Sequence, residues 1–195
     1  MQGRFHWEVI VGALAVLVLG YGQINGLFLV PPDRHMGDVA RILFVHVPVA
    51  IDSMLVFSVS LVAALGFLFT GRRGFDHTQA GLLEVGTILC GLTLVTGSIF
   101  ARPTWGVWWT WDPRLTSSAI WFMTYVGVLV LRVLLTDPDR RALWTAVACV
   151  LAFINIPITY FAVNLFRSMH QLQSGGQDLD GPLKTAWFIN LIGVG

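Results

Sequence analysis

The sequence predicts an all-α integral membrane protein that folds as a single domain over residues 1–195. The chain is 55% hydrophobic and only 12% charged, and its mean hydropathy of +0.72 lies outside the usual range of soluble domains. Uncharged runs such as 9–32 and 142–166 recur along the chain, and about 20 apolar residues suffice to cross a bilayer. No internal repeat or low-complexity tract divides the chain, so one helical membrane domain is expected.

Six transmembrane helices are predicted, at about residues 9–30, 42–70, 80–101, 115–135, 142–165 and 183–195. The first follows Arg4, but its apolar run is too long for a signal peptide and lacks a clear cleavage site, so we expect a retained helix. The second and third each contain one acid, Asp52 and Glu84. The last run is too short to cross at about 1.5 Å per residue, so the sixth helix is incomplete or lies at the interface.

The loops of such a chain alternate between the two faces of the membrane. Loops at about 31–41, 102–114 and 167–182 therefore share one side. Lys and Arg residues divide evenly between the two sides, so the positive-inside rule does not orient the chain. Arginines beside these three loops either anchor in lipid headgroups or pair with an anionic ligand. The net charge of +1 argues against a nucleic-acid partner.

A cluster of tryptophans occupies the second of these loops, in the stretch "WGVWWTWDPRLTSS". Pro103 suits the first position of a helix, and Asp112 followed by Pro113 suits the start of the next span. We therefore predict a short amphipathic helix between them. Helical spacing places one set of side chains on a shared face and turns Trp111 aside; that set is Trp105, Trp108, Trp109 and Asp112. The alternative is an aromatic belt that anchors the loop in headgroups.

Two of the five histidines flank this loop on the same side of the membrane. His46 lies at the outer end of the second span, two residues before Pro48, and His170 lies beyond the outer end of the fifth span. Each alone suits a hydrogen-bonded interfacial residue. Together with the tryptophans and spare arginines, they favour bis-imidazole ligation of haem, in which arginine pairs with propionates. Zinc prefers more ligands at closer spacing.

Three motifs resemble known haem-handling proteins. The stretch "WGVWWTWDPRLTS" closely resembles the tryptophan-rich WWD motif of cytochrome c biogenesis. The stretches "RILFVHVPVA" and "FINIPITYFAVNLFRSMHQ" resemble, in order and spacing, the histidine-bearing segments of the cytochrome c maturation protein C (CcmC) family. The resemblance covers about residues 10–190. It implies six transmembrane helices in the bacterial cell inner membrane, with the tryptophan loop and both histidine loops facing the periplasm.

Carried over by position, the resemblance also implies a set of site residues. The axial ligands of the iron of haem b would be His46 and His170. Near the haem or its partner protein, the resemblance places Arg41 and Arg114. The haem platform would consist of Trp105, Trp108, Trp109, Trp111 and Asp112.

The function that the resemblance implies is haem binding at the periplasmic membrane face and delivery to a periplasmic haem chaperone, CcmE. The implied partners are CcmE, the small protein CcmD and the ABC transporter subunits CcmA and CcmB. The chain contains no Walker A pattern, so any ATPase is a separate chain, and we do not expect an enzyme. Two alternatives stay open: a b-type membrane cytochrome that transfers electrons, and a haem permease with Asp52 and Glu84 as its candidate polar groups.

Overall fold

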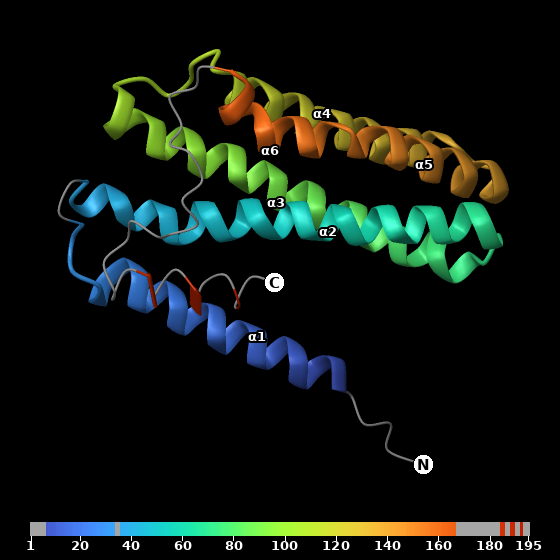
Figure 1. Ribbon diagram of the computed structural model, residues 1–195. Coiled ribbons are helices and arrows are strands. Elements are labelled where there is room, and N and C mark those ends of the chain that lie inside the picture. The colour runs from blue at the N-terminus through green and yellow to red at the C-terminus, as the bar shows by residue number, and fades with distance from the viewer. Residues whose placement is uncertain (1–6, 34–35, 167–183, 186–187, 190–191, 193–195) are drawn as a thin grey trace.

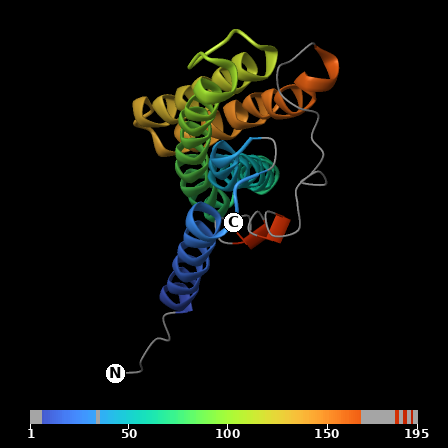
Figure 2. The same cartoon turned by 90° about the vertical axis from the view of Figure 1, so that its left-hand side faces the viewer.

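The computed structural model describes residues 7–33, 36–166, 184–185, 188–189 and 192. In this part of the chain the only regular structure is helical, and one isolated bridge joins Asp33 to Gly37. Helices α2 to α6 lie along one another in a bundle, and α1 slants away from it (Figures 1 and 2). The predicted all-α class is confirmed.

Helix α1 (Trp7–Ile24) is connected to the bundle at its C-terminal end. It continues as a π-helical turn, η1 (Asn25–Leu29), and the 3-10 turn η2 (Asp38–Ile42) leads into α2. A side chain on Gly26 would put its Cβ 2.9 Å from the Phe44 ring, so glycine permits the close approach of η1 to α2. Nη1 of Arg41 donates a hydrogen bond to the carbonyl oxygen of Leu27. These contacts tie the first helix to the second.

Helices α2 (Leu43–Thr70) and α3 (Arg73–Trp105) form a long antiparallel hairpin. Gly71 ends α2 with a positive φ of 65°, and its N–H donates to the Phe67 carbonyl at 2.8 Å, as expected for a left-handed C-terminal cap. In α3, a Cβ on Gly86 would lie 2.8 Å from the Phe57 ring. The small residue lets the two backbones approach, which is a common packing device between membrane helices.

The second half of the bundle consists of α4 (Pro113–Leu134), α5 (Pro138–Phe153) and α6 (Asn155–Leu165). Asp137 caps α5 by accepting the Arg140 N–H at 2.8 Å, and Pro138 occupies the first helical position, where its missing N–H has no cost. Helices α5 and α6 are separated at Ile154. Pro157 accounts for this break because it cannot donate to the carbonyl four residues earlier.

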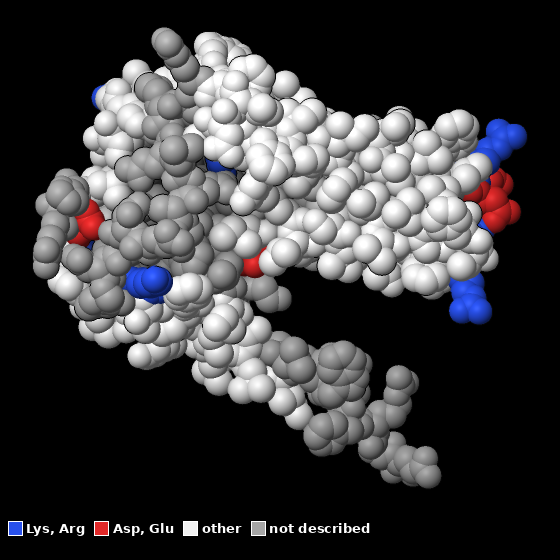
Figure 3. All heavy atoms as spheres, viewed as in Figure 1, with Lys and Arg blue, Asp and Glu red and all other residues white. Residues whose placement is uncertain are grey.

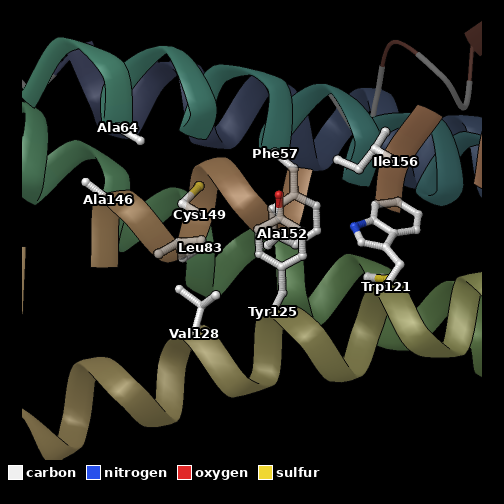
Figure 4. Packing of buried hydrophobic residues seen from close by; sticks show 11 residues of the cluster. Phe57, Ala64, Leu83, Trp121, Tyr125, Val128, Ala146, Cys149, Ala152 and Ile156 are labelled. Carbon is white, nitrogen blue, oxygen red and sulfur yellow. The ribbon is translucent and has the colours of Figure 1, made fainter. Parts of the chain in front are cut away.

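The core lies between α2, α3, α4 and α5, and α6 adds Ile156 to it. The Phe57 and Tyr125 rings stack with centroids 3.6 Å apart, and Trp121 meets Phe57 edge-on at 5.7 Å. Figure 4 shows the three side chains within the buried cluster. Cys149 is fully buried in the same cluster. Since aromatic pairs add about 0.5–1.5 kcal/mol beyond their area burial, these contacts strengthen the packing of α2 against α4.

Charged groups gather at the end of the bundle where α2 meets α3 and α4 meets α5 (Figure 3). There Nη1 of Arg132 donates to Asp76 at 2.7 Å, and Arg73 pairs with Asp139. The flank of the bundle in the same view is mostly uncharged along its length. This distribution is typical of a protein that crosses a membrane several times.

Four helical stretches are long and apolar enough to cross a membrane: Asp38–Thr70, Arg73–Trp105, Pro113–Leu134 and Pro138–Leu165. They correspond to the predicted second to fifth spans, and the predicted span at 115–135 ends one residue beyond the observed helix. A shorter apolar helix, Ala13–Leu29, corresponds to the predicted span at 9–30. Most of the sixth predicted span, 183–195, lies outside the described residues, so the count of six stays a prediction.

Candidate functional site

The tryptophan segment, which we define as residues 105–112, is not the short amphipathic helix that the sequence predicts. Helix α3 runs through Pro103 as far as Trp105. Gly106 then takes a φ of 80° and donates its N–H to the Arg102 carbonyl at 3.0 Å, which ends the helix. Residues 107–112 have no helical hydrogen bonds. The prediction was wrong because α3 continues through Pro103, with the loss of one backbone hydrogen bond to the Ile99 carbonyl, and ends only at Trp105.

The start of α4, in contrast, is as predicted. Oδ1 of Asp112 accepts the Arg114 N–H at 3.0 Å, and Pro113 occupies the first helical position. Asp112 is 7% exposed. Such a cap contributes about 1 kcal/mol. In this structure, therefore, the carboxylate fixes the end of the tryptophan segment to α4.

The four tryptophans do not share a helical face. The Trp105 ring packs edge-on against Phe100 at 6.3 Å, and the Trp109 ring packs edge-on against Trp111 at 6.1 Å. Trp111 is 83% exposed and Trp108 is 59% exposed, whereas Trp105 and Trp109 are half-buried. Helical spacing predicted that Trp111 turns away from Trp109. In the structure the two rings are in contact instead. Trp111 extends an aromatic surface outward from Trp109.

His46 lies in the first turns of α2 and faces α3. Its Nδ1 lies 3.0 Å from Oγ1 of Thr96. A Cβ on Gly97 would lie 3.0 Å from Cε1 of His46, so the imidazole ring rests against the backbone of α3. Pro48 is buried and does not interrupt α2. The side chain is half-buried.

A pocket of about 50 Å³ brings His46, Trp109 and Arg114 together. These residues come from α2, the tryptophan segment and the first turn of α4. Ser98, Ser118 and Thr159 add hydroxyl groups to its wall, and Trp121 closes it toward the aromatic core. The pocket is far smaller than the roughly 300–1,000 Å³ of sites that enclose a drug-sized ligand. It can admit an edge or a substituent of a large flat ligand, whose remainder must lie on the outer surface.

Arg41 has a different position from Arg114. Its Nε pairs with Asp38 at 2.9 Å, and its Nη1 donates to the Leu27 carbonyl. It does not line the pocket, and its contacts connect η1 to η2. The prediction that it lies near a ligand therefore has no support from these contacts.

The second predicted ligand, His170, lies outside the described residues. Within the described residues, no group of three or more His, Cys, Asp or Glu side chains is placed to hold a metal ion. His46 is positioned to supply a single imidazole.

Sequence reasoning missed Thr96 and Gly97, which contact the His46 ring, and Thr159, which lines the pocket. The small polar run "TGS" at 96–98 interrupts an apolar span. This interruption was the available signal, because small and hydroxyl residues in membrane helices commonly mark close contacts between helices.

Comparison with known proteins assigns the family. The family model of heme exporter protein C (CcmC) matches residues 3–193. The chain belongs to the heme exporter protein C family. It is 36% identical over 174 residues to heme exporter protein C of Bradyrhizobium diazoefficiens, an alignment that covers 87% of this chain and 66% of the relative.

Two other members of the family have a similar sequence identity to this chain. Heme exporter protein C of Haemophilus influenzae is 34% identical, over 81% of this chain and 64% of the relative. That of Escherichia coli K12 is 33% identical, over 80% of this chain and 64% of the relative. The chain thus spans about two thirds of the length of these relatives. Family membership and the apolar helices indicate a multi-pass membrane protein.

Proposed function

We propose that this chain takes up haem b at the periplasmic face of the bacterial inner membrane and delivers it to the haem chaperone CcmE. The observation that carries the proposal is the pocket in which His46, Trp109 and Arg114 meet. Their chemistry suits haem as cargo: imidazole ligates iron, an indole packs against a porphyrin and a guanidinium pairs with a carboxylate. Membership of a family named for heme export supports the same cargo.

The fit of haem to this site follows from the size of the pocket and its position. A volume of about 50 Å³ excludes the whole macrocycle but admits a propionate beside Arg114. The exposed rings of Trp108 and Trp111 offer a surface on which the rest of the macrocycle can lie. An exposed site suits a protein that must give its cargo away, and His170 remains the proposed second axial ligand.

The proposed partners follow from this role. CcmE receives the cargo, and CcmD with the ABC transporter subunits CcmA and CcmB completes the complex in the membrane. This chain itself acts as a haem-handling subunit and not as an enzyme. The described residues at the site provide ligation, packing and charge pairing, which suffice for holding and transferring haem.

The direct test is haem transfer from the purified complex. We expect a low-spin absorption spectrum from the complex before haem-free CcmE is added, and loss of that spectrum as haem becomes covalently attached to CcmE. Transfer of electrons from a membrane donor without any loading of CcmE would contradict the proposal and favour a b-type cytochrome.

Replacing Trp109 tests whether the tryptophan segment holds haem or only anchors in lipid. Trp109 lines the pocket, so we expect Trp109→Ala to lower the haem recovered per protein by about tenfold, equivalent to about 1.4 kcal/mol, without lowering the amount of protein in the membrane. The matched control is Trp144→Ala, which removes a half-exposed indole on α5. Equal loss of protein and haem in Trp109→Ala would favour anchoring.

A further inference from the structure

Thr96 is a hydrogen-bonding partner of the His46 ring. Its Oγ1 lies 3.0 Å from Nδ1 of His46. The same oxygen is 2.7 Å from the Leu92 carbonyl and 3.3 Å from the Thr93 carbonyl of α3. A threonine hydroxyl has one hydrogen and two lone pairs, whereas a carbonyl oxygen can only accept. The hydroxyl hydrogen is therefore committed to the α3 backbone.

The remaining role of Oγ1 is to accept, which determines the state of the imidazole. In a neutral histidine, one ring nitrogen carries the hydrogen and the other carries a lone pair. Because Oγ1 of Thr96 accepts from His46, the hydrogen lies on Nδ1. The lone pair then lies on Nε2, and a ring nitrogen with a lone pair is the one that can ligate a metal. Ligating histidines commonly donate their other N–H to a fixed acceptor, which sets the tautomer and the ring orientation.

Gly97 restricts the same ring from one side. Its own hypothetical Cβ would lie 3.0 Å from Cε1 of His46, closer than ordinary van der Waals contact. The imidazole ring therefore packs on the bare backbone of α3 at the residue that follows Thr96. One turn of α3 thus supplies the hydrogen-bond acceptor, on Thr96, and the space that the imidazole ring occupies, beside Gly97.

We propose that Thr96 is a positioning residue, which holds the His46 imidazole with its hydrogen on Nδ1 and its metal-binding lone pair on Nε2. The tautomer assignment rests on the contacts of Thr96 with His46 and with the α3 backbone. Its consequence for haem rests on the proposed function.

The first measurement needs no haem. Nitrogen-15 NMR of the full-length, haem-free chain labelled at histidine distinguishes the two neutral tautomers by the shifts of Nδ1 and Nε2. We expect the His46 signal, assigned by its loss in His46→Ala, to report hydrogen on Nδ1 in the unmodified protein. Thr96→Val removes the acceptor with little change of shape, and should shift this signal toward hydrogen on Nε2, whereas Thr96→Ser should preserve the original signal.

The second measurement is haem affinity of the complex, by titration with haem. We expect Thr96→Val to weaken haem binding by about 10–100-fold, the usual effect of losing a partner that orients a ligating histidine. Thr96→Ser keeps the hydroxyl, so it should bind haem with the affinity of the unmodified protein. The matched control is Thr87→Val, because Thr87 is buried in α3 and makes the same hydroxyl contact, at 2.6 Å to the Leu83 carbonyl. It should bind haem as the unmodified protein does.

The outcomes separate the two proposals. An unchanged His46 signal and unchanged haem affinity in Thr96→Val would overturn the positioning role, even if His46→Ala abolishes ligation. A shifted tautomer in Thr96→Val, with haem ligation that survives His46→Ala, would support the positioning of the ring and contradict His46 as the haem ligand.

Discussion

Replacing His46 by alanine should remove the low-spin haem spectrum of the complex. The imidazole lies at the pocket and is oriented by contacts from α3, so its loss leaves iron with one proposed histidine ligand at most. Because losing an orienting partner alone costs about 10–100-fold in affinity, we expect loss of the ligand itself to reduce bound haem at least about 100-fold. The measurement is the absorption spectrum and haem content of the purified complex, at equal protein level.

The control for this change is His77→Ala, because His77 is exposed near the start of α3, at the opposite end of the helix from Thr96. It should leave both spectrum and haem content unaltered. Supplying free imidazole to His46→Ala should restore part of the low-spin spectrum if the lost group was a ligand. A normal spectrum in a His46→Ala, His170→Ala double variant would show that iron is held elsewhere.

Replacing Arg114 by alanine should impair delivery of haem more than its retention. Arg114 lines the pocket beside His46 and Trp109, and the hydrogen bond that caps α4 comes from its backbone N–H. The substitution therefore removes the guanidinium and preserves the helix start. We expect the complex to keep a low-spin spectrum while covalent loading of CcmE falls at least about tenfold, equivalent to losing about 1.4 kcal/mol from a limiting binding step.

Arg114→Lys tests whether the site needs only a positive charge or the two parallel hydrogen bonds that a guanidinium makes to a carboxylate. A lysine keeps the charge but cannot make two parallel hydrogen bonds to a carboxylate, so it should restore loading only in part. The control is Arg140→Ala, an exposed arginine at the start of α5, which should load CcmE normally. Unaltered loading by Arg114→Ala would remove the reason for placing this arginine at the transfer site.

The two arginines that the family resemblance grouped together have different expected effects. Arg41 bridges Asp38 and the Leu27 carbonyl, so its replacement should loosen the connection between η1 and η2. Arg41 precedes the motif residue His46 by five positions, and Arg114 follows the motif residue Asp112 by two. That spacing says where each lies along its own segment, and not which other segment its side chain meets.

Helix positions could be predicted because each span must satisfy its own backbone within the bilayer. An uncharged run of sufficient length therefore identifies a helix without knowledge of its neighbours. Helix ends were less accurate: α3 begins at Arg73 and ends at Trp105, beyond the predicted 80–101. Helical hydrogen bonding continues past the apolar core into polar residues, where hydropathy no longer distinguishes helix from loop.

The tryptophan segment marks the limit of local reasoning. Asp112 followed by Pro113 predicted the start of α4 correctly, since a cap depends on adjacent residues. Pro103 was misread as a helix start, because proline is compatible with a first turn and is also tolerated near the end of a long helix. The positive φ of Gly106 decided where α3 ends, and this glycine was not recognised as a C-terminal cap.

The sequence by itself determined the helical membrane class and the approximate spans, because each depends on composition or on residues close along the chain. His46 as a ligand stays a prediction, made from its place at a helix end and from the family resemblance. Only the tertiary structure decided that Thr96 and Gly97 hold the His46 ring, and that Trp109 and Arg114 share a pocket with it. Helical periodicity states which residues share a face of one helix. The register between helices is set by how their side chains interlock, at contacts such as Gly86 against Phe57, and this packing is a property of the assembled bundle.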